Sequence, residues 1–310
     1  MQPARPGPAL ALKLALVNIL TRPLAWLPPA WGRALGSAGG RLAFHLLARR
    51  RRVALANMEL VRAAGFLPPD FPARATARAV FANHGCGAWE LVRLYHKGLA
   101  HFLADCHRIE GEDYFAQALA ESRRSGRGLV IITGHLGNWE IMFQYLADLF
   151  DLKLTIVGRR TGRLIDTLTD RLRAMNGHRF LTKDGSAREM LTVLKSGGVL
   201  STFIDQAILK NSPNSTALLP FMGREATFNL GPLRLARKAG AIIILVLFRR
   251  EGRGHFGRAF PPLPPTPDRP EEEDHLAKAG QINAWLGEFI RRYPDQWLWG
   301  HHRWKTRDAP

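Results

Sequence analysis

The chain has 310 residues, and cysteine is nearly absent from it. Its two cysteines, Cys86 and Cys106, have neither metal-ligand nor redox spacing. This excludes a disulfide framework and favours a reducing compartment. None of its 11 histidines forms a His-Glu-x-x-His pattern or a Cys/His zinc pattern. We therefore expect no metal and no other cofactor.

Two further absences exclude function classes. There is no Gly-x-Ser-x-Gly segment, so the serine nucleophile of an α/β-hydrolase is not expected. No zinc-finger, helix-turn-helix or ribonucleoprotein motif accompanies the run Arg49-Arg50-Arg51-Arg52. We therefore expect no nucleic-acid partner. Salt-dependent binding of a duplex by the arginine run is the alternative to be tested.

Acidic residues are also scarce, since 26 Asp and Glu face 44 Lys and Arg, for a net charge of +18. Such an excess favours anionic partners. Residues 1–58 carry nine Lys or Arg and no acidic residue, mixed with leucine and tryptophan. This mixture is typical of a helix in the headgroup region of an anionic membrane. The apolar residues are interrupted at Lys13, Asn18, Arg22 and Pro23, which favours monotopic attachment over a single span or a cleaved signal peptide.

Apolar runs alternate with segments of helical spacing in the rest of the chain. Strands are predicted at 129–133, 152–158, 179–182, 199–205 and 241–248, and helices at 73–97, 138–150, 162–175, 186–195, 231–239 and 271–293. A polar loop is expected at 207–217. This alternation predicts an α/β fold with a mostly parallel central sheet flanked by helices. Residues 1–60 are expected to form a helical membrane-proximal part, broken at Pro23, Pro28-Pro29 and Gly36–Gly40, before an α/β domain over 61–310.

The segment from Leu129 to Glu140 carries the strongest signal of chemistry. Its apolar start predicts a buried strand, and Asn138 is placed to cap the following helix. His135 then lies in the turn, and Glu140 lies in the first helical turn, from which its carboxylate can fold back to the imidazole. A carboxylate that fixes the imidazole tautomer lets histidine accept a hydroxyl proton. The pair therefore predicts general-base chemistry.

A histidine at a strand end is more often a capping or packing residue. The surrounding residues favour catalysis here. Gly134 and Gly137 leave room for a ligand, and the helix N-terminus favours a developing anion. Arg159, which follows another strand, can bind a phosphate or remain solvated. Asp205, which closes an apolar strand, can orient an arginine in the site or cap the next turn.

Other segments accompany this one in order along the chain. They are Arg51-Arg52-Val-Ala-Leu-Ala-Asn57, Gly158-Arg159-Arg160, Asp205-Gln206, Leu219-Pro220-Phe221-Met222-Gly223 and the tail from Pro294 to Arg307. Together with Gly134-His135-Leu-Gly-Asn138-Trp139-Glu140, they resemble the motifs of the bacterial lipid A biosynthesis acyltransferases. These are the lauroyl and myristoyl transferases within the wider lysophospholipid and glycerolipid acyltransferases. The resemblance covers nearly the whole chain.

The resemblance implies transfer of a fatty acyl chain from a thioester to a hydroxyl of a lipid A precursor or related glycolipid. The implied donor is acyl carrier protein or coenzyme A, and the implied location is the cytoplasmic face of the bacterial inner membrane. His135 and Glu140 are the implied catalytic residues. The implied substrate-binding residues are Gly137, Asn138, Trp139, Arg159, Asp205, Gln206, Pro220, Phe221 and Gly223. The alternatives are a different phospholipid acceptor and a non-catalytic lipid-binding protein of the same fold.

Overall fold

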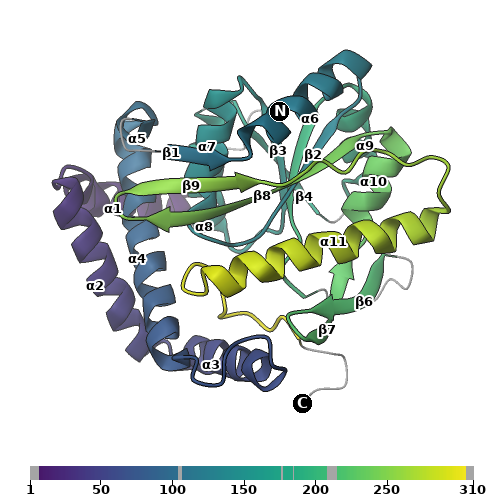
Figure 1. Ribbon diagram of the computed structural model, residues 1–310. Helices are drawn as coiled ribbons and strands as arrows, with labels where there is room; N and C mark the ends of the chain where they lie inside the picture. Colours follow the sequence, from purple (N-terminus) through teal and green to yellow (C-terminus); the bar gives the residue numbers. More distant parts are fainter. Residues whose placement is uncertain (1–6, 104–106, 176, 184, 208–214, 305–310) are drawn as a thin grey trace.

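The computed structural model describes residues 7–103, 107–175, 177–183, 185–207 and 215–304. Cys106, most of the loop expected at 207–217 and residues 305–307 of the tail lie outside the described residues. A seven-stranded sheet forms the centre of the molecule, and helices cover it (Figure 1).

The strand order of this sheet is β1-β9-β8-β2-β5-β3-β4. The parallel strands are β2 (Leu129–Thr133), β3 (Leu154–Gly158), β4 (Arg179–Thr182), β5 (Val199–Phe203) and β8 (Ile242–Glu251). β9 (Gly254–Ala259) runs antiparallel to β8 and parallel to β1 (His107–Glu110). The prediction of a mostly parallel sheet is confirmed. β1 and β9 were not predicted, because neither has a continuous apolar run.

Alternate side chains of β2 enter two different cores, because successive residues of a strand point to opposite faces. Leu129 and Ile131 pack with α6 (Glu112–Ser125) and α7 (Trp139–Leu149). Val130 and Ile132 pack on the other side with three helices: α9 (Ala187–Lys195), α10 (Gly231–Ala239) and α11 (Glu271–Arg292). Burial on both faces explains why the strand reads as an unbroken apolar run. These helices lie within two residues of their predicted bounds where a prediction was made.

In the described residues, five helices precede the first strand of the sheet: α1 (Pro8–Ala25), α2 (Pro29–Leu46), α3 (Ala48–Ala63), α4 (Ala73–Lys97) and the four-residue α5 (Ala100–Leu103). α1 and α2 pack against the long α4 at one side of the molecule (Figure 1). The predicted break at Pro28-Pro29 is confirmed. The breaks expected at Pro23 and at Gly36–Gly40 are wrong, because α1 continues through the proline and α2 through the glycines. The domain boundary near residue 60 stays a prediction.

The glycines of α2 remain helical because they pack directly on α4. A Cβ atom on Gly40 would lie 2.1 Å from the carbonyl oxygen of Phe81, and one on Gly85 would lie 2.2 Å from the carbonyl oxygen of Gly36. The two backbones therefore touch where a larger residue would separate them. Tertiary packing here outweighs the low helix propensity of glycine.

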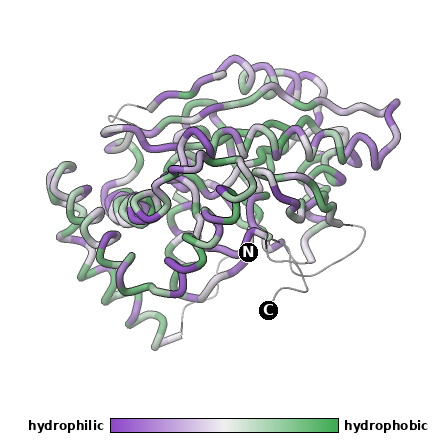
Figure 2. The backbone as a smooth tube through the Cα atoms, turned by 60° about the horizontal axis from the view of Figure 1, so that its bottom comes forward, coloured by the Kyte–Doolittle hydropathy of each residue, from purple (hydrophilic) through white to green (hydrophobic). Residues whose placement is uncertain are grey.

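α1 exposes an apolar face. Its length and composition would allow it to cross a membrane, with a mean hydropathy of 1.3 and 11% of the helix buried. Leu12, Ile19 and Leu20 are among its exposed side chains, and Trp26 follows it. Apolar segments accordingly occur in the outer helices as well as in the interior (Figure 2).

A second, two-stranded sheet consists of β6 (Thr216–Phe221) and β7 (Arg224–Asn229). Met222 and Gly223 form its turn with φ of 52° and 78°, the left-handed conformation of a tight hairpin. After α11, residues 294–304 return across the carboxyl edge of the central sheet. We call these residues the closing segment. Through it, the end of the chain reaches the turn that carries His135.

Candidate active site

His135 lies in the turn after β2, and Asp205 lies after the adjacent strand β5. The two strands are parallel, so their carboxyl ends meet at the same edge of the sheet, where ligand sites of such sheets occur. The amide of Ile204 donates a hydrogen bond of 3.1 Å to the carbonyl of Thr133, which aligns the two loops. Sheet topology thus brings together two residues that are 70 positions apart.

The carboxylate of Asp205 holds the histidine through two hydrogen bonds. Its Oδ1 lies 2.8 Å from Nδ1 of His135, and its Oδ2 accepts from the His135 backbone N–H at 2.8 Å. Oδ2 also accepts from Nε1 of Trp297 at 2.8 Å. Asp205 is fully buried. Burial alone would raise the pKa of its carboxyl, but the charge and hydrogen bonds of His135, with the charge of His301, outweigh burial and hold the pKa well below its usual range.

Aromatic rings fix the plane of the imidazole. Phe203 stacks on it with ring centroids 4.3 Å apart, and Trp139 meets it edge to face at 4.9 Å. Nε2 has no hydrogen-bond partner in the part of the chain that the structure describes. Because the Asp205 carboxylate accepts from Nδ1, the ring proton lies on Nδ1 and the lone pair on Nε2. This is the tautomer that a general base requires.

Glu140 has a different partner from the one expected. The structure does not bring its carboxylate to the imidazole. Its Oε1 and Oε2 accept from Arg173 of α8 (Arg163–Ala174) at 2.5 and 3.1 Å, and both side chains are nearly buried. The expected fold-back was wrong because Asp205 already occupies the Nδ1 side of His135, and sequence spacing does not show a carboxylate from another strand. A catalytic role for Glu140 stays a prediction.

Asn138 caps α7 as predicted. Its Oδ1 accepts from the amide of Ile141 at 3.5 Å, and its Nδ2 donates to Glu90 of α4 at 2.8 Å. Glu90 is itself buried and paired with Arg250 of β8. The cap beside His135 is therefore anchored in a polar network between α4 and the sheet, and both ends of its amide are engaged within the protein.

Gly137 and the closing segment brace the turn from the other side. Gly137 has φ of 58°, and a Cβ on it would lie 3.0 Å from the backbone of Arg249. Its amide donates to the carbonyl of Gln296 at 3.0 Å, and the amide of Leu298 donates to the carbonyl of His135 at 3.0 Å. The glycine thus serves close backbone packing. Substrate contact at Gly137 stays a prediction.

Three residues hold the site although the sequence predicted no role in it for any of them. Trp297 donates to Asp205, His301 lies 2.9 Å from the Asp205 carbonyl through Nε2, and Arg173 holds Glu140. The tail from Pro294 to Arg307 was noted as one of the segments that resemble the family, and this is the one signal that pointed to Trp297 and His301. Arg173 lies in an amphipathic helix where a charged residue is ordinary, so no local signal distinguished it.

Arg159 and Gln206 also lie at the carboxyl edge. Arg159 follows β3, which neighbours β5, and its side chain is exposed. Gln206 follows Asp205 and is also exposed. Neighbouring strands lie about 4.8 Å apart, so Arg159 is about two strand widths from the His135 strand. Its contact with a phosphate stays a prediction.

Pro220, Phe221 and Gly223 belong to the β6–β7 hairpin, whose contacts are internal packing. The Phe221 ring stacks on Trp304 at 5.8 Å and lies 6.0 Å from the ring of Trp297. The carbonyl of Pro220 accepts from Asn283 at 3.1 Å, and Gly223 packs against Ala64. Phe221 therefore reaches Asp205 through Trp297, while substrate contact by the hairpin stays a prediction.

A groove of about 860 Å³ adjoins the His135–Asp205 pair. Its walls are mainly apolar side chains and glycines of α2 and α4. Four residues connect it to the pair: His84, Gln206, Leu298 and His301. His84 lies 6.3 Å from the ring of Trp139, and the others neighbour His135 or Asp205 in sequence or by hydrogen bond. In the described residues, no group of three or more His, Cys, Asp or Glu is placed to hold a metal ion.

The fold and site define an α/β protein in which a carboxylate-bound histidine adjoins an apolar groove, as expected of an enzyme that acts on lipid chains. The family model of the bacterial lipid A biosynthesis acyltransferases matches residues 7–306. The chain belongs to this family and is an acyltransferase of lipid A biosynthesis.

Curated relatives are distant but similar over most of their length. The chain is 24% identical over 278 residues to the lipid A biosynthesis lauroyltransferase of Escherichia coli (strain K12), covering 88% of this chain and 85% of that protein. It is 25% identical over 280 residues to the lipid A biosynthesis palmitoleoyltransferase of the same strain, covering 88% and 84%. The same values hold for a lipid A biosynthesis acyltransferase of Shigella flexneri.

Proposed function

We propose that this acyltransferase moves a fatty acyl chain from the thioester of acyl carrier protein to a hydroxyl of a lipid A precursor or related glycolipid, with His135 as general base. The contact between Nδ1 of His135 and buried Asp205 carries the proposal, because it leaves the lone pair on Nε2. Family membership supports the acceptor class. The net charge of +18 supports an acidic donor protein and an anionic membrane as partners.

In this reaction, Nε2 of His135 accepts the hydroxyl proton while the hydroxyl oxygen attacks the thioester carbonyl carbon. The carbon–sulfur bond then breaks, the ester remains on the acceptor, and the proton passes from Nε2 to the leaving thiolate. No acyl-enzyme forms. Backbone N–H groups at the N-terminus of α7, beside His135, support the negative charge on the carbonyl oxygen.

The groove along α2 and α4 holds the acyl chain in this proposal, since its walls are apolar and its polar residues lie beside the pair. Each methylene buried there contributes about 0.8 kcal/mol to binding. Arg159 binds a phosphate of the acceptor or of the donor's phosphopantetheine arm from the same sheet edge. Glu140 acts as a positioning residue, because its ion pair with Arg173 fixes the first turn of α7 against α8.

Attachment at the cytoplasmic face of the inner membrane completes the proposal. The exposed leucines and isoleucine of α1, with Trp26 at its end, supply the apolar contact. The nine Lys or Arg within residues 1–58 supply attraction to anionic lipid. We favour monotopic attachment over a single span, because α1 also packs along α4.

The test is turnover by the purified full-length protein, with acyl carrier protein or coenzyme A thioesters as donors and a lipid A precursor or phospholipids as acceptors. Mass spectrometry identifies the product. We expect acylated lipid A precursor from the carrier thioester and none from His135→Ala. The matched control is His302→Ala, which removes an exposed histidine outside the site.

Near-wild-type turnover by His135→Ala would exclude the general-base mechanism. Acylation of phospholipid with an inert lipid A precursor would replace the proposed acceptor. Transfer from coenzyme A alone would replace the proposed donor. Lipid binding without turnover for any donor would favour the non-catalytic alternative.

A further inference from the structure

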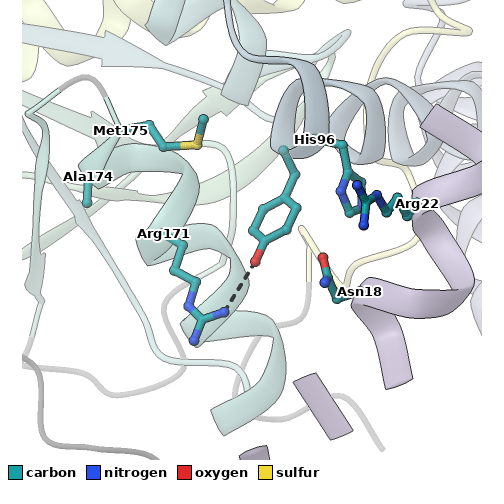
Figure 3. Close-up of a pocket in the computed structure, with 7 residues that line it drawn as sticks. Asn18, Arg22, His96, Arg171, Ala174 and Met175 are labelled. Carbon is teal, nitrogen blue, oxygen red and sulfur yellow. Dashed lines mark hydrogen bonds between the residues drawn. The ribbon is translucent and has the colours of Figure 1, made fainter. Parts of the chain in front are cut away.

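A second pocket, distant from His135 along α4, lies where α1, α4 and α8 meet (Figure 3). Its volume is about 690 Å³, and its lining is rich in hydrogen-bonding groups. The polar lining residues are Asn18, Arg22, Tyr95, His96 and Arg171. Tyr95 is 11 positions after His84, which corresponds to about 16 Å along a helix. The pocket is therefore separate from the site described above.

Hydrogen bonds fix the helices around this pocket. The hydroxyl of Thr21 donates to the carbonyl of Val17 at 2.6 Å, so at 2.9 Å it accepts from Nε2 of His96. Arg171 donates to the Tyr95 hydroxyl at 3.2 Å (Figure 3). α1 and α8 are thus both tied to α4, and the guanidinium of Arg171 is held in place at the pocket wall.

The pocket has uncompensated positive charge. Within the residues that the structure describes, neither Arg22 nor Arg171 forms an ion pair with a carboxylate, whereas the nearby Arg160 and Arg173 are paired with Asp170 and Glu140. Burial lowers the pKa of His96, and the charge of Arg22 lowers it further. Two guanidiniums without a carboxylate partner around one concavity suit a tetrahedral oxyanion, because a guanidinium can bind such an anion through two N–H groups.

The position of Arg22 indicates where that anion comes from. On α1 each residue turns by 100°, so Arg22 lies next to the exposed apolar face that carries Ile19 and Leu20. Trp26 follows at the helix end, and Lys97 lies 4.3 Å from the centre of its ring. Arginine, lysine and tryptophan beside an apolar face are typical of headgroup depth in a membrane. Insertion of this apolar face into a membrane would bring the pocket to the depth of the lipid phosphates.

We propose that Arg22 and Arg171 jointly bind the phosphate group of a membrane lipid at this three-helix pocket. The bound lipid orients the protein on the membrane, because it connects α1 to α8. This inference depends on the pocket and on the apolar face of α1, and it holds whichever acyl donor and acceptor the enzyme uses.

The experiment measures flotation of the full-length protein with phosphatidylcholine vesicles that contain phosphatidic acid. Lys13→Ala is the matched control, since it also removes one exposed positive charge from α1. General attraction of a basic residue to an anionic surface predicts about a fivefold loss of partitioning for Lys13→Ala. For Arg22→Ala and Arg171→Ala we expect a loss of about tenfold or more, because a bound phosphate is lost as well.

Three further measurements distinguish a shared site from scattered charge. Each removed charge should cost the general fivefold loss measured with Lys13→Ala, and the additional loss from the bound phosphate should appear only once in the double variant Arg22→Ala/Arg171→Ala, whereas two independent sites would show it twice. On vesicles of equal surface potential that carry oleic acid instead, Arg22→Ala should behave like Lys13→Ala. Arg22→Lys keeps the charge and the fold, and it should still weaken binding to phosphatidic acid, because lysine lacks the planar fork.

Equal partitioning of Arg22→Ala and Lys13→Ala on phosphatidic acid vesicles, or an additional phosphate-specific loss that appears twice in the double variant, would overturn the proposal. Titration with inorganic phosphate tests the alternative occupant of the pocket, a soluble phosphate. Binding of free phosphate by the wild type, with vesicle partitioning unaffected by Arg22→Ala, would assign the pocket to a soluble phosphate and overturn the assignment to lipid.

Discussion

Asparagine at position 205 would preserve the shape of the site and reverse the imidazole tautomer. In the wild type, Oδ2 of Asp205 accepts from two N–H donors, the His135 backbone and Trp297 Nε1, each at 2.8 Å. In Asp205→Asn, these donors fix the amide oxygen in that position. The amide nitrogen then takes the place of Oδ1 and donates to Nδ1 of His135. The ring proton must move to Nε2, which can no longer accept a proton.

The expected loss of kcat follows from the change of tautomer. In Ser-His-Asp enzymes, the wrong tautomer lowers kcat by about 10⁴, which corresponds to about 5 kcal/mol of activation free energy. We expect a loss of this order for Asp205→Asn with little change in KM, because the groove is unaltered. Asp205→Ala differs, since it leaves two buried N–H donors without an acceptor, at a cost of about 1–3 kcal/mol of stability each.

The assay combines steady-state kinetics with ¹⁵N NMR of the labelled imidazole. We expect the wild type to carry the ring proton on Nδ1 and Asp205→Asn to carry it on Nε2, with similar melting temperatures. Glu140→Gln serves as the comparison and should lower kcat less, because Glu140 contacts Arg173. A kcat of Asp205→Asn within tenfold of wild type would refute the reasoning. An inactive Glu140→Gln beside an active Asp205→Asn would make Glu140 the partner of His135.

Two other predictions concern stability. Gly40→Ala should lower the free energy of unfolding by about 1–3 kcal/mol, as in an overpacked core, because its Cβ would lie 2.1 Å from the Phe81 carbonyl oxygen. Gly39→Ala is the control, because no atom lies within 4 Å of a Cβ at this position; it should be neutral or stabilising by about 0.5–1 kcal/mol. Urea denaturation compares the two variants, and equal effects on stability would contradict direct backbone packing at Gly40. Burial lowers the pKa of His178 to about 4, so below pH 6.5 the unfolded chain binds a proton that the folded chain does not bind until about pH 4. The free energy of unfolding should therefore fall as pH drops from 6.5 to 4. It should fall less in His178→Asn, which keeps an acceptor for the Leu154 amide. Identical pH profiles of stability for both proteins would exclude His178 as the titrating group.

Local pattern was sufficient for much of the fold. Apolar runs predicted β2 and β8, and 3.6-residue spacing predicted α7, α10 and α11, because both faces of the sheet are buried and each helix must cover one of them. The capping role of Asn138 and the position of His135 in a strand-to-helix turn also followed from neighbouring residues. The closing segment was evident in the sequence as part of the tail that resembles the family, but its contact with Asp205 was not predicted.

Long-range contacts decided the rest. The continuity of α2 through Gly36–Gly40 depends on the backbone of α4, which no property of α2 alone reveals. The partner of His135 depends on β5 lying next to β2, so the carboxylate comes from Asp205 and Glu140 turns to Arg173. Sequence spacing determines what residues on one helix or strand can reach. Which strands become neighbours depends on the packing of the whole sheet, and for this reason the carboxylate of Asp205, and not that of Glu140, contacts the imidazole of His135.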